Sequence, residues 1–218
     1  MKLVKPSIKF LNVTEDPLKA IELAGRTCYK SEDKITEDSA EKFVQMLIKR
    51  GHEAMIEHAS ASYCIVCDRG VTHEIVRHRL FSYAQESTRY CNYKGGVTFV
   101  IPPWTIMPEA FKREQEDQIS REDMILFDDP HTQSWAKSLL YSENSYLELL
   151  SQGWTPQQAR SVLPNSLKTE IVVTGNLREW KHFFKLRCAK VAHPQMQEVA
   201  NMVLADMQQR VPVIFDTV

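Results

Sequence analysis

The sequence lacks the features that mark a membrane protein or a general nucleic-acid binder. It has no apolar run of about 18 residues, and the lysines of the N-terminal segment MKLVKPSIKFLNV are spread out rather than grouped before an apolar stretch. Its 27 basic residues are balanced by 28 acidic ones, so no global positive field exists to attract nucleic acid. The five cysteines, odd in number and irregularly spaced, are typical of reduced thiols. We therefore expect a cytoplasmic protein that neither spans a membrane nor binds nucleic acid.

A glycine-rich dinucleotide loop is also missing. No Gly-x-Gly-x-x-Gly motif occurs, and the predicted strands and helices do not alternate in a regular β-α-β order. A chain of 218 residues can bury a substantial core, and no linker, repeat or low-complexity tract divides it. We expect one α+β domain over residues 1–218, with a mixed sheet of a few strands packed with helices, and not a Rossmann fold.

Hydrophobic spacing and capping residues predict the elements of this domain. Asp16 before Pro17 predicts a capped helix start, and Asn176 with Glu179 three residues later predicts a capping box. The charged stretch 108–129 indicates a solvated helix or an excursion over the surface. The predicted strands cover residues 2–13, 59–68, 97–101 and 167–174, and the predicted helices cover residues 17–29, 36–50, 70–79, 135–150, 156–163, 177–187 and 195–210.

The histidines and cysteines do not have the spacing of a metal site. His52 and Glu53 begin like the helical HExxH motif, but the next histidine, His58, comes six residues after the first. Six residues turn a helix by about 600°, so the two imidazoles would point to different faces. Cys64 and Cys67 would lie on opposite faces of a strand, and no second cysteine pair of this spacing exists. We expect no bound metal.

The segment from Arg77 to Tyr90, RHRLFSYAQESTRY, concentrates cationic and polar side chains. It contains Arg77, Arg79 and Arg89, with Glu86 as the only acid among them. A guanidinium is always charged and offers five donors, so three held close together need a large anion or several carboxylates. One arginine could serve the last carbonyls of a helix. Three within fourteen residues instead predict the binding of a phosphate or diphosphate.

The spacing inside this segment is specific. RHR is followed after two residues by Ser82, and Ser87 precedes Arg89 by two positions. Three further motifs lie elsewhere in the chain: GHEAMIEH at 51–58, ARSVLP at 159–164 and NLREWKHFFKLR at 176–187. In their sequence and order, these motifs resemble the flavin-dependent thymidylate synthases. The resemblance covers most of the chain, although residues 104–148 carry little of it.

This resemblance implies an enzyme that converts deoxyuridylate (dUMP) to thymidylate (dTMP). Its implied cofactor is FAD, with methylenetetrahydrofolate as carbon donor and NADPH as reductant, both of them co-substrates. It also implies a homotetramer whose active sites are shared between subunits. The helix that carries Trp180, Phe183, Phe184 and Arg187 agrees with this expectation, because aromatics beside an arginine are favoured at interfaces.

The resemblance also implies which residues bind each ligand. In physical terms, the arginines neutralise the phosphate of a dianionic nucleotide and withdraw charge from its uracil. Arg187 and Ser87 are the expected catalytic residues. The residues expected to contact FAD are His52, Glu57, Arg77, His78, Arg79, Asn176, Arg178, His182 and His193. The residues expected to bind dUMP are Glu74, Gln85, Ser87, Arg89, Arg160 and Arg187.

Two positions depart from the family pattern. Glu74 stands where several relatives carry glutamine, and Thr88 replaces the glycine of some relatives. No cysteine lies in a Pro-Cys-His setting, which excludes the thiol-dependent thymidylate synthases. Ser87 as a nucleophile would need a general base, and the local sequence offers none, so a hydrogen-bonding role is favoured. A nucleotide- or RNA-binding module without catalysis remains the alternative, because Phe81, Tyr83, Tyr90 and Tyr93 could stack on bases.

Overall fold

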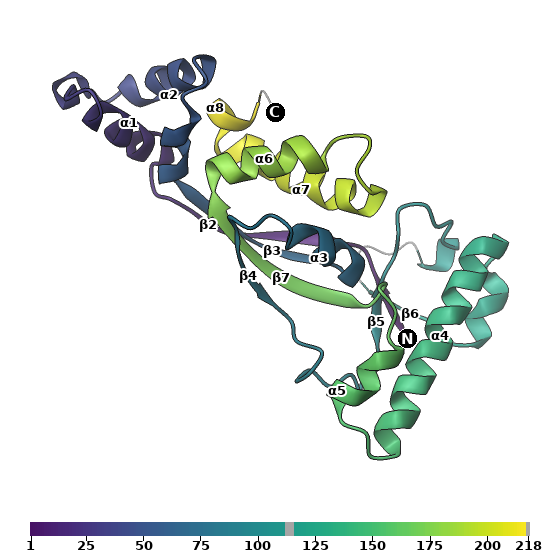
Figure 1. Cartoon of the computed structure of the whole chain (residues 1–218). Helices are drawn as coiled ribbons and strands as arrows, with labels where there is room; N and C mark the ends of the chain where they lie inside the picture. The colour runs from purple at the N-terminus through teal and green to yellow at the C-terminus, as the bar shows by residue number, and fades with distance from the viewer. Residues whose placement is uncertain (112–115, 217–218) are drawn as a thin grey trace. The chain divides into compact units, whose positions relative to one another are not determined.

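The computed structural model describes residues 1–111 and 116–216, and the chain divides into two compact units. The first unit comprises Met1–Ser7, Val66–His73 and Gln85–Ile171, and the second comprises Ile8–Ile65, Glu74–Ala84 and Val172–Val218. Both units combine strands with helices, so the predicted α+β class is confirmed (Figure 1). One domain over residues 1–218 stays a prediction.

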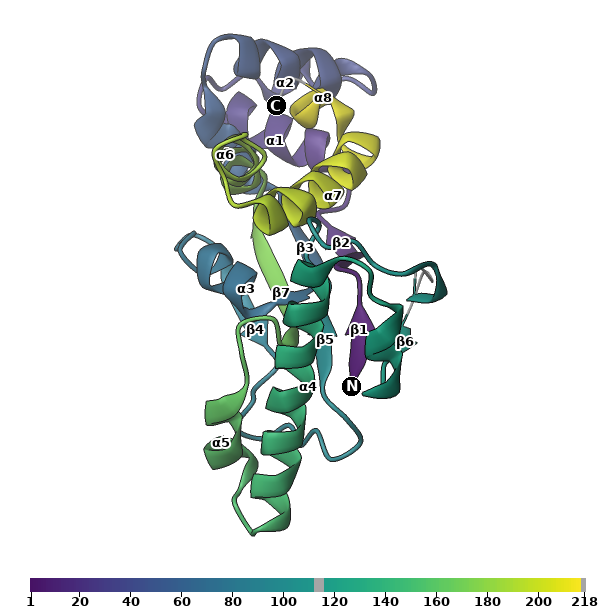
Figure 2. The same cartoon turned by 90° about the vertical axis from the view of Figure 1, so that its right-hand side faces the viewer.

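A three-stranded sheet and a long helix build the first unit (Figure 2). β1 (Lys2–Val4) lies between β5 (Thr98–Val100), which is parallel to it, and β6 (Glu116–Gln118), which is antiparallel. α4 (Pro130–Ser151) begins at Asp129, whose carboxylate accepts a hydrogen bond from the backbone N–H of Thr132 at 2.7 Å. α5 (Pro156–Ala159) follows α4. The buried apolar cluster of this unit includes Leu3, Phe99, Phe127, Leu139 and Tyr146.

The second unit contains most residues of a four-stranded sheet and most of the remaining helices. The strand order is β2 (Ser7–Val13), β3 (Ser60–Asp68), β7 (Lys168–Asn176) and β4 (Ser82–Gln85). β3 is followed directly by α3 (Arg69–Ile75). The helices of the second unit are α1 (Pro17–Thr27), the 3-10 helix Glu32–Lys34, α2 (Ser39–Lys49), the 3-10 helix Glu53–His58, α6 (Leu177–Arg187), α7 (Pro194–Arg210) and α8 (Pro212–Phe215).

Aromatic side chains fill the core of the second unit. Trp180 and Phe183 are fully buried, and Phe184 is 1% exposed. The ring of Trp180 meets that of Tyr63 edge-on at 5.6 Å between centroids, and Phe184 meets Phe215 in the same way. Burying one such side chain contributes about 1.5–3 kcal/mol to folding. The aromatics that the sequence placed at a subunit interface therefore pack inside their own chain, and that expectation was wrong.

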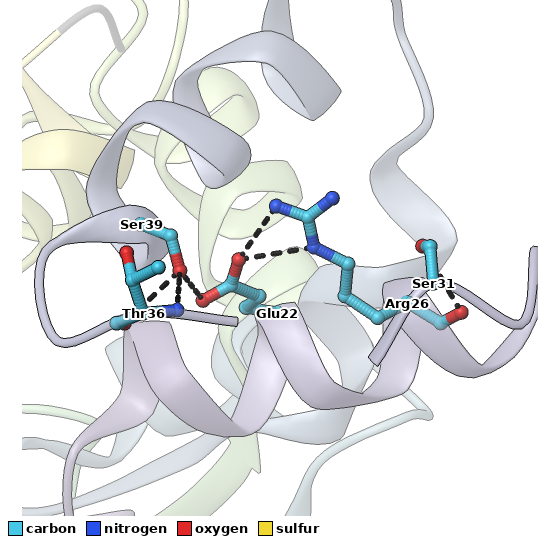
Figure 3. Close-up of polar contacts among 5 residues, drawn as sticks. All are labelled: Glu22, Arg26, Ser31, Thr36 and Ser39. Atoms are coloured by element: carbon cyan, nitrogen blue, oxygen red, sulfur yellow. Dashed lines mark hydrogen bonds and ion pairs between the residues drawn. The ribbon is translucent and has the colours of Figure 1, made fainter. Parts of the chain in front are cut away.

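A buried carboxylate ties α1 to the segment that begins α2 (Figure 3). Glu22 on α1 is 1% exposed, and its Oε1 accepts hydrogen bonds from Nε and Nη2 of Arg26 at 3.1 and 3.0 Å. Its Oε2 accepts a third from the hydroxyl of Ser39, at 2.8 Å. The Arg26 guanidinium also lies over the ring of Phe43, 4.4 Å from its centroid. A buried charge with partners on every oxygen fixes the two helices instead of destabilising them.

Most predicted elements are present, with shifted ends. The strand expected over residues 2–13 is divided into β1 and β2. Asp16 precedes α1 as predicted, but its backbone is left-handed, with φ 45°, and its side chain caps nothing. α2 begins at Ser39 rather than near Thr36. Gly51 and Gly153 follow their helices with φ of 71° and 94°, as stop residues should.

Two short strands were not predicted. β4 has the polar sequence SYAQ. β6 lies in the charged stretch 108–129, for which the sequence predicts a solvated helix or an excursion over the surface. That stretch also contains 3-10 turns at Glu109–Phe111 and Glu122–Leu126, and its residues 112–115 lie outside the described part of the chain. Within the described residues, none of the helices has the length and apolar character needed to cross a membrane.

Candidate functional site

A cleft of about 960 Å³ opens beside α6 in the second unit. α6 begins at Asn176, whose side-chain oxygen accepts a hydrogen bond from the backbone N–H of Glu179 at 2.8 Å. Four basic residues of the helix, at positions one to four apart, line the cleft together with Glu179 and Phe184, while Trp180 turns toward the core. These four cleft residues are Arg178, Lys181, His182 and Lys185. The cleft wall is therefore cationic along one side.

Carboxylates of the 3-10 helix Glu53–His58 face this cationic wall. Glu57 pairs with Arg178, and Glu53 pairs with Lys181. The first pair is about half exposed on both sides, so it contributes little to stability and can be exchanged for another anion. His52, which precedes this helix, and His193, which precedes α7, are both exposed.

His78 is buried beside the cleft residue His182, with 5.9 Å between the centroids of the two rings. It is 5% exposed, and its Nε2 accepts a hydrogen bond from Nε of Arg187 at 3.0 Å. Burial, and then the charges of Arg187 and His182, lower the pKa of His78 to about 4. The imidazole is therefore neutral at pH 7. Because Nε2 is an acceptor, the proton sits on Nδ1, which lies 3.4 Å from Oε1 of Glu179.

Arg187 has a carboxylate partner of its own chain. Its Nη1 lies 2.7 Å from Oε2 of Glu74, and its Nη2 donates to the backbone oxygen of the same residue at 3.2 Å. Glu74 therefore supplies the counter-charge of the Arg187 guanidinium within the same chain. The structure thus assembles Glu74, Arg187, His78 and Glu179 into one chain of polar contacts, with burial raising the pKa of Glu179.

The other arginines of the RHR segment are exposed. Among the residues that the structure describes, no carboxylate forms an ion pair with Arg77, Arg79 or Arg89. Phe81 of the same segment is buried against Gly175 of β7, where an added Cβ would lie 1.9 Å from the Phe81 ring. The lack of a side chain at position 175 therefore lets the Phe81 ring pack against β7.

The first unit holds a separate group of the predicted residues. Nε2 of Gln85 donates to the hydroxyls of Thr72 and Thr169 at 3.0 and 3.3 Å. The hydroxyl of Ser87 accepts a hydrogen bond from the backbone N–H of Arg89 at 3.3 Å. The guanidinium of Arg89 is exposed and lies 5.3 Å from the centroid of its neighbour, the Tyr90 ring.

Glu86 does not neutralise these arginines. Its Oε1 accepts a hydrogen bond from the hydroxyl of Tyr93 at 2.7 Å, and its Oε2 lies 3.3 Å from Nζ of Lys168. Burial and this bond raise the pKa of the Tyr93 hydroxyl. Because Glu86 contacts Tyr93 and Lys168, it does not neutralise the arginines of residues 77–90. This segment therefore has the excess of positive charge that its sequence predicts.

A smaller cavity of about 270 Å³ in the first unit contains Arg160. Nη1 of Arg160 donates to the hydroxyl of Thr88 at 2.8 Å, and Thr88 is 5% exposed. Thr88 is the residue that departs from the glycine of some relatives, and its hydroxyl now has a visible partner. Arg69 lines the same cavity.

The thiols and histidines form no other reactive group in the described chain. None of the five cysteines, all of which lie in the described chain, forms a disulfide, and burial raises the pKa of Cys188 to about 11. Within residues 1–111 and 116–216, no three His, Cys, Asp or Glu side chains lie close enough together to hold a metal ion. Cys67 is buried and Cys64 is half-buried on the same strand.

Several residues of these sites were not assigned to a ligand from the sequence, among them Glu53, Glu179, Lys181 and Arg69. A signal existed for Glu179, which stands four residues before Phe183 and thus next to it on the helix. An acid beside a buried aromatic indicates a polar partner in the core. No sequence signal distinguishes Lys181 from a lysine on a solvated helix face. None marks Arg69 either, which lies between Asp68 and Gly70 outside any motif.

Comparison with known proteins agrees with this arrangement. Residues 9–213 match the family model described as thymidylate synthase complementing protein. A flavin-dependent thymidylate synthase from Pyrococcus furiosus is 34% identical over 213 residues, which cover 93% of this chain and 79% of that protein. A flavin-dependent thymidylate synthase from Mycobacterium marinum is 32% identical, covering 98% and 84%. The chain belongs to the family of flavin-dependent thymidylate synthases.

The fold of this thymidylate synthase family is also found among solved structures. The crystal structure of a UMP/dUMP methylase, PolB from Streptomyces cacaoi, bound with 5-Br dUMP, has a TM-score of 0.77. It is 24% identical and covers 99% of this chain and 96% of its own. The predictions of the family, of a flavin-dependent enzyme and of thymidylate synthesis are confirmed. The alternative of a binding module without catalysis is therefore abandoned.

Proposed function

We propose that the chain converts dUMP to dTMP with bound FAD, taking carbon from methylenetetrahydrofolate and reducing power from NADPH. Family membership supports the reaction, and one structural observation supports its location. α6 carries Arg178 and His182 on the cleft and Arg187 beside the neutral His78. The residues expected at FAD and the residue expected at the uracil are thus held on a single rigid element.

The cleft suits FAD in size and charge. About 960 Å³ is in the range of sites that enclose a large cofactor. Arg178 and His182 line it, and Arg77 and Arg79 bring two further unpaired guanidiniums on the segment that precedes Leu80, another cleft residue. Together these groups would hold the diphosphate, with His52, Glu57, Asn176 and His193 as the further FAD contacts. When bound, FAD supplies the hydride that reduces the transferred carbon.

The nucleotide is assigned to the remaining arginines. Arg89 and Arg160 would hold its phosphate, with Gln85 and Ser87 as hydrogen-bonding residues. Arg187 and Glu74 would contact the uracil, where a guanidinium draws negative charge away from the ring and makes its carbon 6 more electrophilic. The neutral His78 keeps Arg187 in place, because Nε2 can only accept the bond from the arginine.

No covalent enzyme nucleophile is needed in this proposal. The hydroxyl of Ser87 accepts a bond from the backbone of Arg89, and no histidine or carboxylate of the described chain hydrogen-bonds it. A serine without a general base is a weak nucleophile. We assign Ser87 to hydrogen bonding at the nucleotide, and Arg187 to the electrostatic step.

A homotetramer with shared active sites and a cytoplasmic location also belong to the proposal. Family membership supports the first, since the aromatic face of α6 no longer does. The five cysteines, odd in number and irregularly spaced, support the second.

The visible absorption spectrum and a dTMP assay test the proposal. The purified protein should be yellow or turn yellow with added FAD, and should form dTMP only when dUMP, methylenetetrahydrofolate and NADPH are all present. Arg178→Ala should lower FAD occupancy, whereas Arg121→Ala, at an exposed arginine of the first unit, should not. A protein that neither binds FAD by calorimetry nor makes dTMP would contradict the proposed function.

A further inference from the structure

Glu179 is a buried acid on the wall of the cleft, and the proposed function gives it no role. It is 6% exposed and lines the cleft from the first turn of α6. Burial raises its pKa, so the fold disfavours the charged form that an acid has at neutral pH. Groups with pKa values perturbed in this way are concentrated at functional sites.

Capping of α6 does not account for this acid. In a capping box, the acid at the third helical position accepts a hydrogen bond from the backbone N–H of the capping residue. The side chain of Asn176 accepts a bond from the N–H of Glu179, but within the described chain the Glu179 carboxylate does not accept one from the N–H of Asn176. Oε1 of Glu179 lies instead 3.4 Å from Nδ1 of His78.

The imidazole of His78 has a different partner at each nitrogen. Its Nε2 accepts the hydrogen bond from Nε of Arg187, and its Nδ1 lies beside Glu179. The rings of Phe81 and Phe183 pack around it, with centroids 6.0 and 5.0 Å from its own. These aromatic neighbours restrict the rotation of the imidazole and offer its nitrogens no hydrogen-bond acceptor in the ring plane.

The proton on Nδ1 couples Glu179 to Arg187. A neutral imidazole has two tautomers, and only the one with its proton on Nδ1 can accept a hydrogen bond at Nε2. A carboxylate beside Nδ1 favours this tautomer, because it attracts an N–H dipole and repels a lone pair. The other tautomer would direct an N–H of His78 at the Nε donor of Arg187 and would leave Nδ1 without a proton beside Glu179.

We propose that Glu179 is a positioning residue, which holds the proton of His78 on Nδ1 so that His78 keeps the guanidinium of Arg187 oriented toward the uracil. This inference rests on the proposed function for the contact of Arg187 with the base. Three of the five donors of Arg187 are used by His78 and by the carboxylate and backbone oxygen of Glu74, so two are left for the base. Glu179 is not among the residues that the family resemblance assigns to a ligand.

NMR of the full-length protein with isotope-labelled histidine tests the first link, both without and with FAD. The His78 signals are assigned by their loss in His78→Gln. Wild type should carry the proton on Nδ1, and Glu179→Leu, which lacks an acceptor, should show the second tautomer. Glu179→Gln keeps an acceptor oxygen and should keep the wild-type tautomer as its main form. The control Glu41→Gln, at an exposed acid of α2, should give the wild-type tautomer.

Turnover of the FAD-loaded enzyme tests the second link. At saturating dUMP, Glu179→Leu should lower kcat about 10- to 100-fold, because a displacement of about 1 Å in a reacting group can cost about 100-fold. Glu179→Gln should fall between this variant and wild type. Because Glu179 acts through His78, Glu179→Leu should have little further effect in a His78→Gln background.

Thermal unfolding separates this role from a structural one. Leucine avoids the cost of burying a carboxylate, so Glu179→Leu should leave the melting temperature unchanged or raise it, whereas loss of a capping or packing residue would lower it. If Glu179→Leu does not fold, Glu179→Ala takes its place in all three measurements, since its smaller side chain opens space toward the cleft instead of filling it.

The outcomes distinguish this inference from the proposed function. A wild-type tautomer in Glu179→Leu overturns the inference, and so does a changed tautomer with normal kcat, because His78 would then not control Arg187. Equal losses of activity in Glu179→Leu and Glu179→Gln with lowered melting temperatures overturn it in favour of a structural role. A wild-type protein that binds FAD but forms no dTMP overturns the proposed function and the role of Glu179 in the reaction, whatever tautomer His78 has.

Discussion

Nε of Arg187 donates a hydrogen bond to Nε2 of His78 over 3.0 Å, although the two residues are 109 positions apart in the chain. An imidazolium has no acceptor nitrogen, so this bond exists only while His78 is neutral. On the other side of the ring, Oε1 of Glu179 lies 3.4 Å from Nδ1, the nitrogen that carries the proton. The pair therefore fixes both the protonation state and the tautomer of the histidine in the RHR segment.

The first prediction follows from the pKa of His78. The unfolded chain protonates this residue near pH 6.5, and the folded chain only near pH 4, so the unfolded state binds more protons between these values. Stability should consequently fall as the pH falls from about 6.5 to 4, by at most about 1.4 kcal/mol per pH unit from this residue. Urea unfolding of wild type and His78→Gln should show a shallower pH dependence in the variant. Identical slopes in the two proteins would contradict the assignment.

Gly175 should tolerate no side chain. In Gly175→Ala the added Cβ would collide with the Phe81 ring, so we expect a loss of about 1–3 kcal/mol in the free energy of unfolding and a lower FAD content. Gly95→Ala is the control, because nothing lies within 4 Å of a Cβ there. Adding Phe81→Leu to Gly175→Ala should recover part of the loss. If the single and double variants are equally unstable, the close approach to Phe81 is not the cause.

Arg89 should bind the nucleotide through its planar fork. Arg89→Lys keeps the charge but loses the bidentate geometry, so dUMP binding should weaken by about 1.5–3 kcal/mol in calorimetry. The FAD content, read from the visible spectrum, should stay near that of wild type, as it should for the control Arg121→Lys. Unchanged dUMP affinity with a loss of flavin would mean that the arginines are divided between the two ligands in another way.

No thiol should be required for turnover. Each of the five cysteines, replaced one at a time by serine, or by alanine at the buried Cys67, should leave dUMP-dependent dTMP formation in every folded variant. The raised pKa of Cys188 agrees, because it keeps this thiol protonated at neutral pH. An inactive variant that still binds FAD and dUMP would identify a catalytic cysteine.

Shared active sites predict rescue between inactive subunits. If Arg89 of one subunit and Arg187 of another serve the same nucleotide, mixing Arg89→Ala with Arg187→Ala chains under conditions of subunit exchange should restore some sites with both arginines. Activity should rise above that of either variant alone. Mixed tetramers seen by mass spectrometry without any rise in activity would place both arginines in the site of one chain.

Local signals were enough to predict most of the elements. Asn176 caps α6 as its side chain and position predict, and Gly51 ends α2 in the left-handed conformation. Asp16 failed as a cap because its own backbone is left-handed, which turns the carboxylate away from the first turn. β4 and β6 could not be predicted from the sequence, because their short polar segments form strands only by pairing with distant strands and not through their own strand propensity.

Site residues that belong to sequence motifs could be predicted. Contacts between residues that lie far apart in the sequence could not. The resemblance placed His78, Arg178 and Arg187 on elements that the structure brings together in the second unit. That Glu74 is the partner of Arg187, over 113 positions, follows from no local pattern. The lone Arg69 became visible only through the cavity that it lines.

Helix α6 meets a different environment on each of its sides. Trp180 faces the aromatic core, Arg178 faces the cleft, and Arg187 reaches Glu74 and His78. One residue inserted into this helix would turn every later side chain by about 100° and carry lysines into the core. The count of residues between Asn176 and Arg187 is therefore under a stricter constraint than most of their identities, and an alignment gap within this interval would be incompatible with the site.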